Sequence, residues 1–186
     1  RRAGTGRGVR PPVTRTLGLM SEERVPDPAH HVAVNRPANP INLPIGVTWS
    51  IQILHSKGSS PLVEIDADRV CATASIGKVL LLIAVAEQIE SGALSAHTPL
   101  SRANVGRVAD SGLWQYLDVD ELSVSDLGSL VGSTSDNLAT NVLLRSVGID
   151  AVAATGHRLG MTQTALHDIV RDHRLPEHPS ALSSGS

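Results

Sequence analysis

The longest uninterrupted apolar run in the chain extends from Val79 to Ala86 and predicts a buried helix. Polar residues follow the run, and Gly92 suits the position just past a helix C-terminus. A segment from Ser75 to Ser91 is long enough for a helix and too long for a single strand. Because it has almost no polar face, this helix should lie at the centre of a domain. The apolar run is far too short to span a bilayer.

Apolar and polar residues alternate before this helix, which is the pattern of half-buried strands. Val47–Leu54 and Pro61–Asp66 are two such segments, and the short polar turn between them predicts a β-hairpin. Residues 91–112 have no sustained period and are predicted to be irregular.

Three shorter helices are predicted from capping residues at their starts and from glycines at two of their ends. From Met161 onward the chain is polar and predicted to be loop-like, with no further strand. The predicted helices begin at Ser123 or Ser125 and end near Val131, begin at 135–137 and end near Val147, and run from Ala151 to Leu159 with Asp150 as the cap.

A hairpin followed by a helical block predicts an α+β fold organised around the central helix. Residues 1–44, rich in Arg, Gly and Pro up to about Pro40, are predicted to be a disordered or weakly ordered extension. Residues 45–186 are predicted to form one domain. Because two strands alone are marginally stable, the C-terminal strands of this domain are expected to be missing, so the chain should be truncated.

The start of the central helix carries the first candidate chemistry. Ser75 and Lys78 are three residues apart and therefore lie on one helix face. A lysine at the edge of an apolar core has a lowered pKa and can accept a proton from a serine hydroxyl. The alternative is that Ser75 only caps the helix while Lys78 extends past the core to solvent.

Composition favours Lys78 as a proton acceptor and limits the kinds of partner that the protein can have. Of the 16 Lys and Arg residues only Lys57 and Lys78 are lysines, and arginine cannot lose its proton. The net charge of −2 gives no basic footprint for nucleic acid. The single Cys71 excludes an internal disulfide and is predicted to be buried. The histidine spacing fits no zinc pattern, so no metal and no cofactor are expected.

Ser135-Asp136-Asn137 lies 60 residues after Ser75 in a predicted turn before a helix, where capping is one reading. Together with Ser75-x-x-Lys78, however, this motif resembles the penicillin-recognising serine hydrolases, and class A β-lactamases in particular. The resemblance extends from about Gly46 to Met161. It implies a β-lactamase/transpeptidase-like fold.

The resemblance also implies a role for each motif residue. Ser75 would be the acylated nucleophile, and its backbone N–H would form half of the oxyanion hole. Lys78 would accept the proton of Ser75 or organise its hydrogen bonds. Ser135 would relay a proton to the leaving nitrogen, and Asn137 would orient the substrate amide and contact Lys78. Asp136 would brace the turn.

Two departures from the family pattern limit the functional reading. The later Lys-Thr-Gly or Lys-Ser-Gly motif is absent from the sequence, which points to an incomplete chain. The loop after Met161 lacks the expected Glu pattern, and Asp168 and Asp172 are the nearest candidate carboxylates. The alternatives are therefore a β-lactamase, a penicillin-binding or esterase-like protein that deacylates poorly, and a non-catalytic fragment.

The expected partner is a small molecule, a β-lactam or a related amide or ester, with no nucleic acid and no membrane span. The complete protein is expected to be a monomer. Family resemblance implies a secreted or periplasmic bacterial enzyme, although no signal peptide is visible in the sequence.

Overall fold

A computed structural model describes residues 41–57, 61–179 and 181–185 of the 186-residue chain. Internal contacts divide the chain into two units, Arg1–Ala33 and Val34–Ser186. The first unit and most of the predicted N-terminal extension lie outside the described residues. The helices and strands described below all belong to the second unit.

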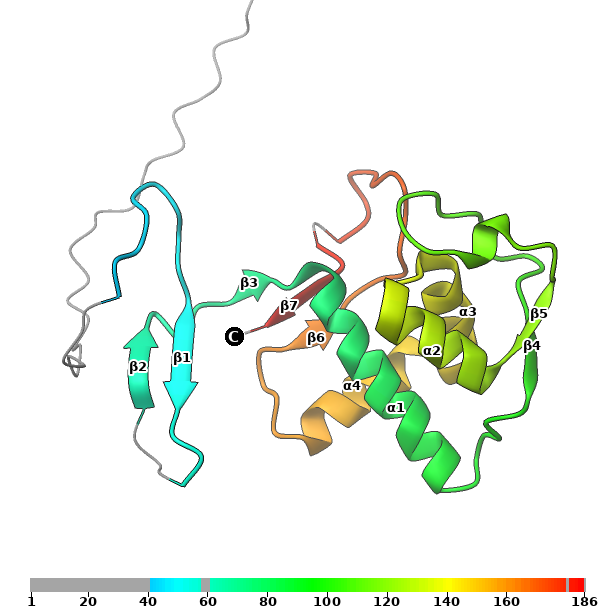
Figure 1. The fold of residues 1–186 in the computed structure, drawn as a ribbon, viewed down its shortest axis with the longest axis horizontal. Helices are drawn as coiled ribbons and strands as arrows, with labels where there is room; N and C mark the ends of the chain where they lie inside the picture. The colour runs from blue at the N-terminus through cyan, green and yellow to red at the C-terminus, as the bar shows by residue number, and fades with distance from the viewer. Residues whose placement is uncertain (1–40, 58–60, 180, 186) are drawn as a thin grey trace, which may run out of the picture. The chain divides into compact units, whose positions relative to one another are not determined.

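The predicted central helix is present, but it begins later than the sequence suggested. A 3₁₀ turn, η1 (Ala74–Gly77), comes first, and the α-helix α1 (Lys78–Glu90) follows directly. Leucine, alanine and valine side chains of α1 are buried in the core, whereas Val79 is 52% exposed. Helix α1 contacts the three other α-helices among the described residues (Figure 1), which are α2 (Val124–Thr134), α3 (Asn137–Val147) and α4 (Ile149–Arg158).

Side-chain caps start α2 and α3 as the sequence predicted. Ser123 accepts a hydrogen bond from Asp126 N at the start of α2, and Asp136 accepts one from Ala139 N at the start of α3. The predicted cap of α4 is wrong. Gly148, with φ +87°, both ends α3 and precedes α4, so Asp150 lies within the first turn of α4.

The predicted hairpin is formed by β1 (Ile51–Leu54) and β2 (Pro61–Ile65), which pair antiparallel with Ile51 opposite Ile65. Strand β1 is shorter than predicted: the alternating pattern begins at Val47, but the strand begins at Ile51. Apolar side chains of both strands are exposed, including Ile53 at 44% and Leu62 at 50%.

The prediction of no strand after Met161 is wrong. The short strands β6 (Ala165–Leu166) and β7 (Ser183–Gly185) pair antiparallel, and β7 also pairs with β3 (Cys71–Ala72). Strand β7 is therefore the middle strand of a three-stranded sheet, and it contacts η1 (Figure 1). Cys71, predicted to be buried, is exposed on β3.

The segment 91–112, predicted to be irregular, contains one strand of a second antiparallel pair. Strand β4 (Pro99–Ser101) pairs antiparallel with β5 (Glu121–Ser123). The 3₁₀ turn η2 (Trp114–Tyr116) lies between them in sequence, and Trp114 is fully buried in the core. The described helices include no single one long and apolar enough to cross a membrane; one pair, α3 with α4, reaches that length and hydropathy together but is bent by 83°.

Candidate active site

Ser75 lies in η1, one turn before α1, and its side chain is exposed. Neither η1 nor α1 is capped by this serine: Thr73 and Gly77 occupy the cap positions, and neither makes a side-chain cap bond. The residue before the serine, Ala74, has φ +48°, a left-handed conformation that is uncommon for a residue with a Cβ. The serine is therefore presented on a tight turn at the N-terminal end of the central helix.

Lys78 is buried, with only 3% of its surface exposed, so it does not extend to solvent. Its Nζ donates to Ser135 O at 2.7 Å, to Ser135 Oγ at 2.8 Å and to Asn137 Oδ1 at 2.6 Å. An ammonium group has three donors, and each has an acceptor here. The structure thus brings together three residues that are 57 and 59 positions apart in sequence.

Burial lowers the pKa of Lys78 below its ordinary value of 10.5, and the negative charge of Asp136 opposes this effect without cancelling it. The direction is the one that the sequence predicted. A lysine with a lowered pKa can lose its proton at a lower pH than an exposed lysine does. Lys78 is therefore a candidate proton acceptor as well as a hydrogen-bond donor.

Ser135 ends α2 in the left-handed conformation, with φ +54° and ψ +37°. This conformation lets the carbonyl and the hydroxyl of one residue accept hydrogen bonds from the same ammonium group. Ser111 holds the turn from outside, because its hydroxyl donates to Thr134 O and its carbonyl accepts from Asn137 N. The geometry of Ser135 is thus set by contacts on both sides of the motif.

Asp136 is 1% exposed and accepts three backbone hydrogen bonds. Leu113 N and Trp114 N donate to Oδ2 at 2.7 and 2.8 Å, and Ala139 N donates to Oδ1 at 2.9 Å. Gly112, with φ +116°, makes room for this carboxylate, since a Cβ there would lie 2.4 Å from Asp136 Cγ. Asp136 therefore joins the 112–114 loop to the start of α3.

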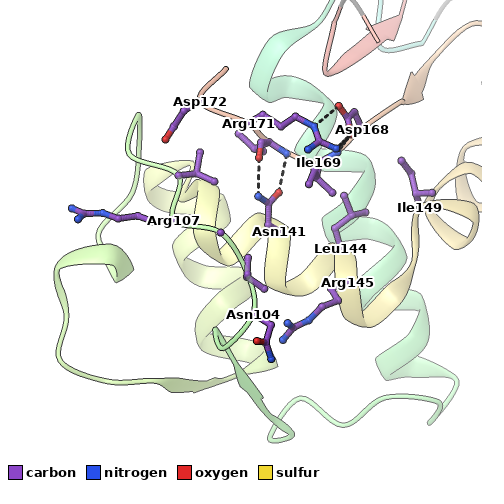
Figure 2. A pocket seen from close by; sticks show the side chains of 14 residues that line it. Asn104, Arg107, Asn141, Leu144, Arg145, Ile149, Asp168, Ile169, Arg171 and Asp172 are labelled. Carbon is purple, nitrogen blue, oxygen red and sulfur yellow. Dashed lines mark hydrogen bonds and ion pairs between the residues drawn. The ribbon is translucent and has the colours of Figure 1, made fainter. Parts of the chain in front are cut away.

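Asp168, one of the two predicted loop carboxylates, forms ion pairs with two arginines, and Figure 2 shows the pair with Arg171. Arg171 Nε lies 3.0 Å and Arg174 Nη1 3.2 Å from its Oδ2, and Ile169 N donates to Oδ1 at 2.8 Å. Burial raises the pKa of Asp168, but these hydrogen bonds and charges outweigh it and hold the pKa below its ordinary value. A carboxylate held in this way is a weak proton acceptor.

Asp172, the second predicted carboxylate, accepts hydrogen bonds from Ala109 N at 2.9 and 3.2 Å. Neither carboxylate takes part in the hydrogen bonds of Lys78, which go to Ser135 and Asn137. Both line a cavity of about 680 Å³ beside α3 (Figure 2). The two loop carboxylates are therefore not part of the hydrogen-bond network that Lys78 forms with Ser135 and Asn137.

Asn141 is a site-adjacent residue that sequence reasoning missed. It lies one turn beyond Asn137 on α3, and its side chain pairs with both backbone groups of Val170 at 2.8 Å (Figure 2). In the segment after β6, Val170 is thus held to this part of α3, and its side chain is not a carboxylate. An amide four residues after Asn137, among apolar neighbours, was the available sequence signal.

The described residues contain no group of three or more His, Cys, Asp or Glu side chains arranged to hold a metal ion. Every buried side-chain nitrogen and oxygen atom among them has a hydrogen-bond partner. The groups that the candidate site presents are the Ser75 hydroxyl, the buried Lys78 amine, the Ser135 hydroxyl and the Asn137 amide.

Solved structures with similar folds are β-lactamases and penicillin-binding proteins. A β-lactamase from Sphaerobacter thermophilus is 31% identical, with a TM-score of 0.60 over 66% of this chain and 46% of that one. Penicillin-binding protein D2 from Listeria monocytogenes is 22% identical, with a TM-score of 0.55 over 68% and 51%. A PBP-A mutant is 20% identical, with a TM-score of 0.56 over 67% and 46%.

These likenesses define the β-lactamase/transpeptidase-like fold that the sequence predicted. The sequence profile of the Beta-lactamase enzyme family matches residues 44–183, so the chain belongs to this family. No curated protein sequence matches the chain. The chain spans about half the length of the solved structures that it matches.

Proposed function

We propose that the protein is a serine hydrolase that opens β-lactam amides through an acyl-enzyme on Ser75. The observation that carries this proposal is the buried Lys78, bonded to Ser135 and Asn137 three residues after an exposed serine. Family membership supports the substrate class. A buried amine with a lowered pKa is the group needed to take a proton from Ser75.

The reaction assigns one step to each group. Neutral Lys78 accepts the hydroxyl proton as Ser75 Oγ attacks the lactam carbonyl carbon, and the Ser75 N–H donates to the oxyanion that forms. The C–N bond then breaks, and the ring nitrogen takes a proton that passes from Lys78 to Ser135 over their 2.8 Å hydrogen bond. Asn137 orients the substrate amide. Water finally hydrolyses the ester on Ser75.

A second candidate function is that of a penicillin-binding protein that is acylated readily and deacylates slowly. The loop observations favour it, because Asp168 is paired with arginines, Asp172 binds Ala109 N, and the residue held to α3 is Val170. Among the structures with this fold, the PBP-A mutant is an acyl-enzyme complex with penicillin G, and the Listeria protein has ampicillin bound.

Burst kinetics with a chromogenic cephalosporin test both candidates in the full-length protein. A burst of one equivalent followed by fast turnover supports the β-lactamase, and a burst followed by slow turnover supports the penicillin-binding protein. Ser75→Ala should abolish burst and turnover, a loss of roughly 10³-fold or more. Ser91→Ala, at the other end of α1, is the matched control and should behave as wild type. Absence of any burst or turnover in the wild type would refute the proposed function.

A further inference from the structure

Ser183 is fully buried, although it follows a polar loop and lies more than one hundred residues after the serine motif. Its backbone carbonyl accepts a hydrogen bond from Thr73 N at 3.1 Å. Its hydroxyl donates to Ala74 O at 2.9 Å and also contacts Thr73 Oγ1. Three contacts thus connect one residue of β7 to the two residues that precede Ser75.

The direction of these hydrogen bonds follows from the donors available. A serine hydroxyl carries one hydrogen, and a backbone carbonyl can only accept. The hydrogen of Ser183 therefore goes to Ala74 O, so the Thr73 hydroxyl is the donor in the contact between Thr73 and Ser183. The result is a chain from Thr73 through Ser183 to Ala74, in which each bond polarises the next.

The carbonyl of Ala74 belongs to the same peptide unit as the N–H of Ser75. A peptide unit is planar, and its C=O and N–H point in opposite directions when it is trans. The hydrogen bond on Ala74 O therefore fixes the direction of Ser75 N–H. Ala74 has φ +48°, which is unfavourable for alanine, so this orientation needs support from its surroundings.

Gly77 permits the close approach of Ser183. A Cβ at position 77 would lie 2.3 Å from Ser183 Oγ and 2.4 Å from Ser183 Cβ, which no real side chain tolerates. The helical φ of Gly77, −57°, makes no demand for glycine by itself. The glycine between Ser75 and Lys78 is therefore explained by the space that Ser183 occupies.

We propose that Ser183 is a positioning residue that orients the Ser75 N–H as an oxyanion donor. This role rests on the proposed function, because it assigns an oxyanion to the Ser75 site. Ser183 touches no reacting atom and acts through the Ala74–Ser75 peptide. Strand β7 is thus part of the catalytic apparatus as well as of the fold.

The test compares Ser183→Ala with Ser184→Ala in the full-length protein. Ser184 is the matched control, because it is the next residue of β7 and its hydroxyl bonds to His167 Nε2. For each protein the acylation rate constant, the penicillin Kd and the burst amplitude are measured. The affinity for a boronic acid is measured too, because its tetrahedral adduct on serine places an oxygen in the oxyanion position.

Ser183→Ala should lower the acylation rate constant by about 10- to 100-fold, as expected when a reacting group is misplaced. The boronic acid affinity should fall by a similar factor, while penicillin Kd and burst amplitude stay unchanged. Ser184→Ala should match wild type in all four values. Thr73→Val, which removes only the first donor of the chain, should lower the acylation rate by roughly threefold or more.

A reduced burst amplitude with a wild-type rate and boronic acid affinity would show that Ser183 only stabilises the fold, and it would overturn the proposal. Equal behaviour of Ser183→Ala and Ser184→Ala would also overturn it. If Ser183→Ala cannot be purified, wild-type kinetics and boronic acid affinity in Thr73→Val would refute the hydrogen-bonded chain. If β-lactams acylate the wild type and the variants are acylated equally fast, the role of Ser183 is rejected and the proposed function stands. If β-lactams do not acylate the wild type, both the proposed function and the role of Ser183 are rejected.

Discussion

Replacing Asp136 by alanine should destabilise the protein more than any single capping substitution. The carboxylate is 1% exposed and accepts hydrogen bonds from Leu113 N, Trp114 N and Ala139 N. Each buried N–H left without an acceptor costs about 1–3 kcal/mol. A water molecule that enters the space left by the side chain can recover part of this loss. With three donors left unpaired and part of the loss recovered by water, the free energy of unfolding should fall by about 3–5 kcal/mol.

Urea unfolding of the full-length protein measures this loss as a lower midpoint at an unchanged m-value. Ser123→Ala is the control, because Ser123 caps α2 through a single backbone N–H near the surface. Its loss should be about 1 kcal/mol. If Asp136→Ala lowers the free energy of unfolding no more than Ser123→Ala does, then Asp136 does not hold the 112–114 loop to α3.

Further predictions concern acylation, deacylation and the loop. Lys78→Arg keeps the charge but cannot accept a proton, so acylation should slow by on the order of 10²–10⁴; near wild-type labelling would make Lys78 a structural cation. Acylation should rise with pH as Lys78 loses its proton, and Asp136→Asn should move this rise to lower pH, because the Asp136 charge raises the pKa of Lys78. An unmoved pH–rate profile would contradict that coupling. Val170→Glu should shorten the acyl-enzyme lifetime by roughly tenfold or more, since Asn141 holds this residue to α3; an equal change in Val170→Gln would rule out base catalysis. The lowered pKa of Asp168 means that its pairing stabilises the loop above its ordinary pKa of 3.8 and is lost as pH falls through the lower folded value. Proteolysis of the loop should therefore be faster in acid than at neutral pH in the wild type. In Asp168→Asn it should be equally fast in acid and at neutral pH.

The helices of this chain were predictable because their signals are local. The apolar run after Lys78 predicts α1 to within a few residues. The caps of α2 and α3, Ser123 and Asp136, are each among the two or three adjacent candidates that the sequence offers. The start of α4 was misplaced because a glycine with positive φ preceded the more obvious cap, Asp150. Local capping rules choose among neighbouring residues less reliably than they detect a helix.

The short strands could not be predicted from the sequence. Strands β6 and β7 have two and three residues, and β7 is a Ser-Ser-Gly segment with no apolar alternation. The pairing of β7 with β3 joins segments more than one hundred residues apart, and no local pattern predicts such a contact. The contact between Ser183 and Ala74 was missed for the same reason.

The sequence offers the residues of the candidate site and, through the family resemblance, the contact of Asn137 with Lys78, which the structure contains. Ser75, Lys78, Ser135 and Asn137 were found from two short motifs, and the structure brings the last three into hydrogen-bond contact. The pairing of Asp168 with arginines depends on how the loop folds back on itself, which spacing alone does not determine.

An acyl-enzyme at Ser75 can be tested by locating a penicillin adduct on the full-length protein. Trypsin cleavage after Arg69 and Lys78 releases the peptide of residues 70–78, which carries Cys71, Thr73 and Ser75 as possible nucleophiles. Fragmentation of this peptide should place the added mass on Ser75, and Ser75→Ala should show none. An adduct on Cys71 or Thr73, or a peptide that stays unmodified while the protein is intact, would contradict an acyl-enzyme at Ser75.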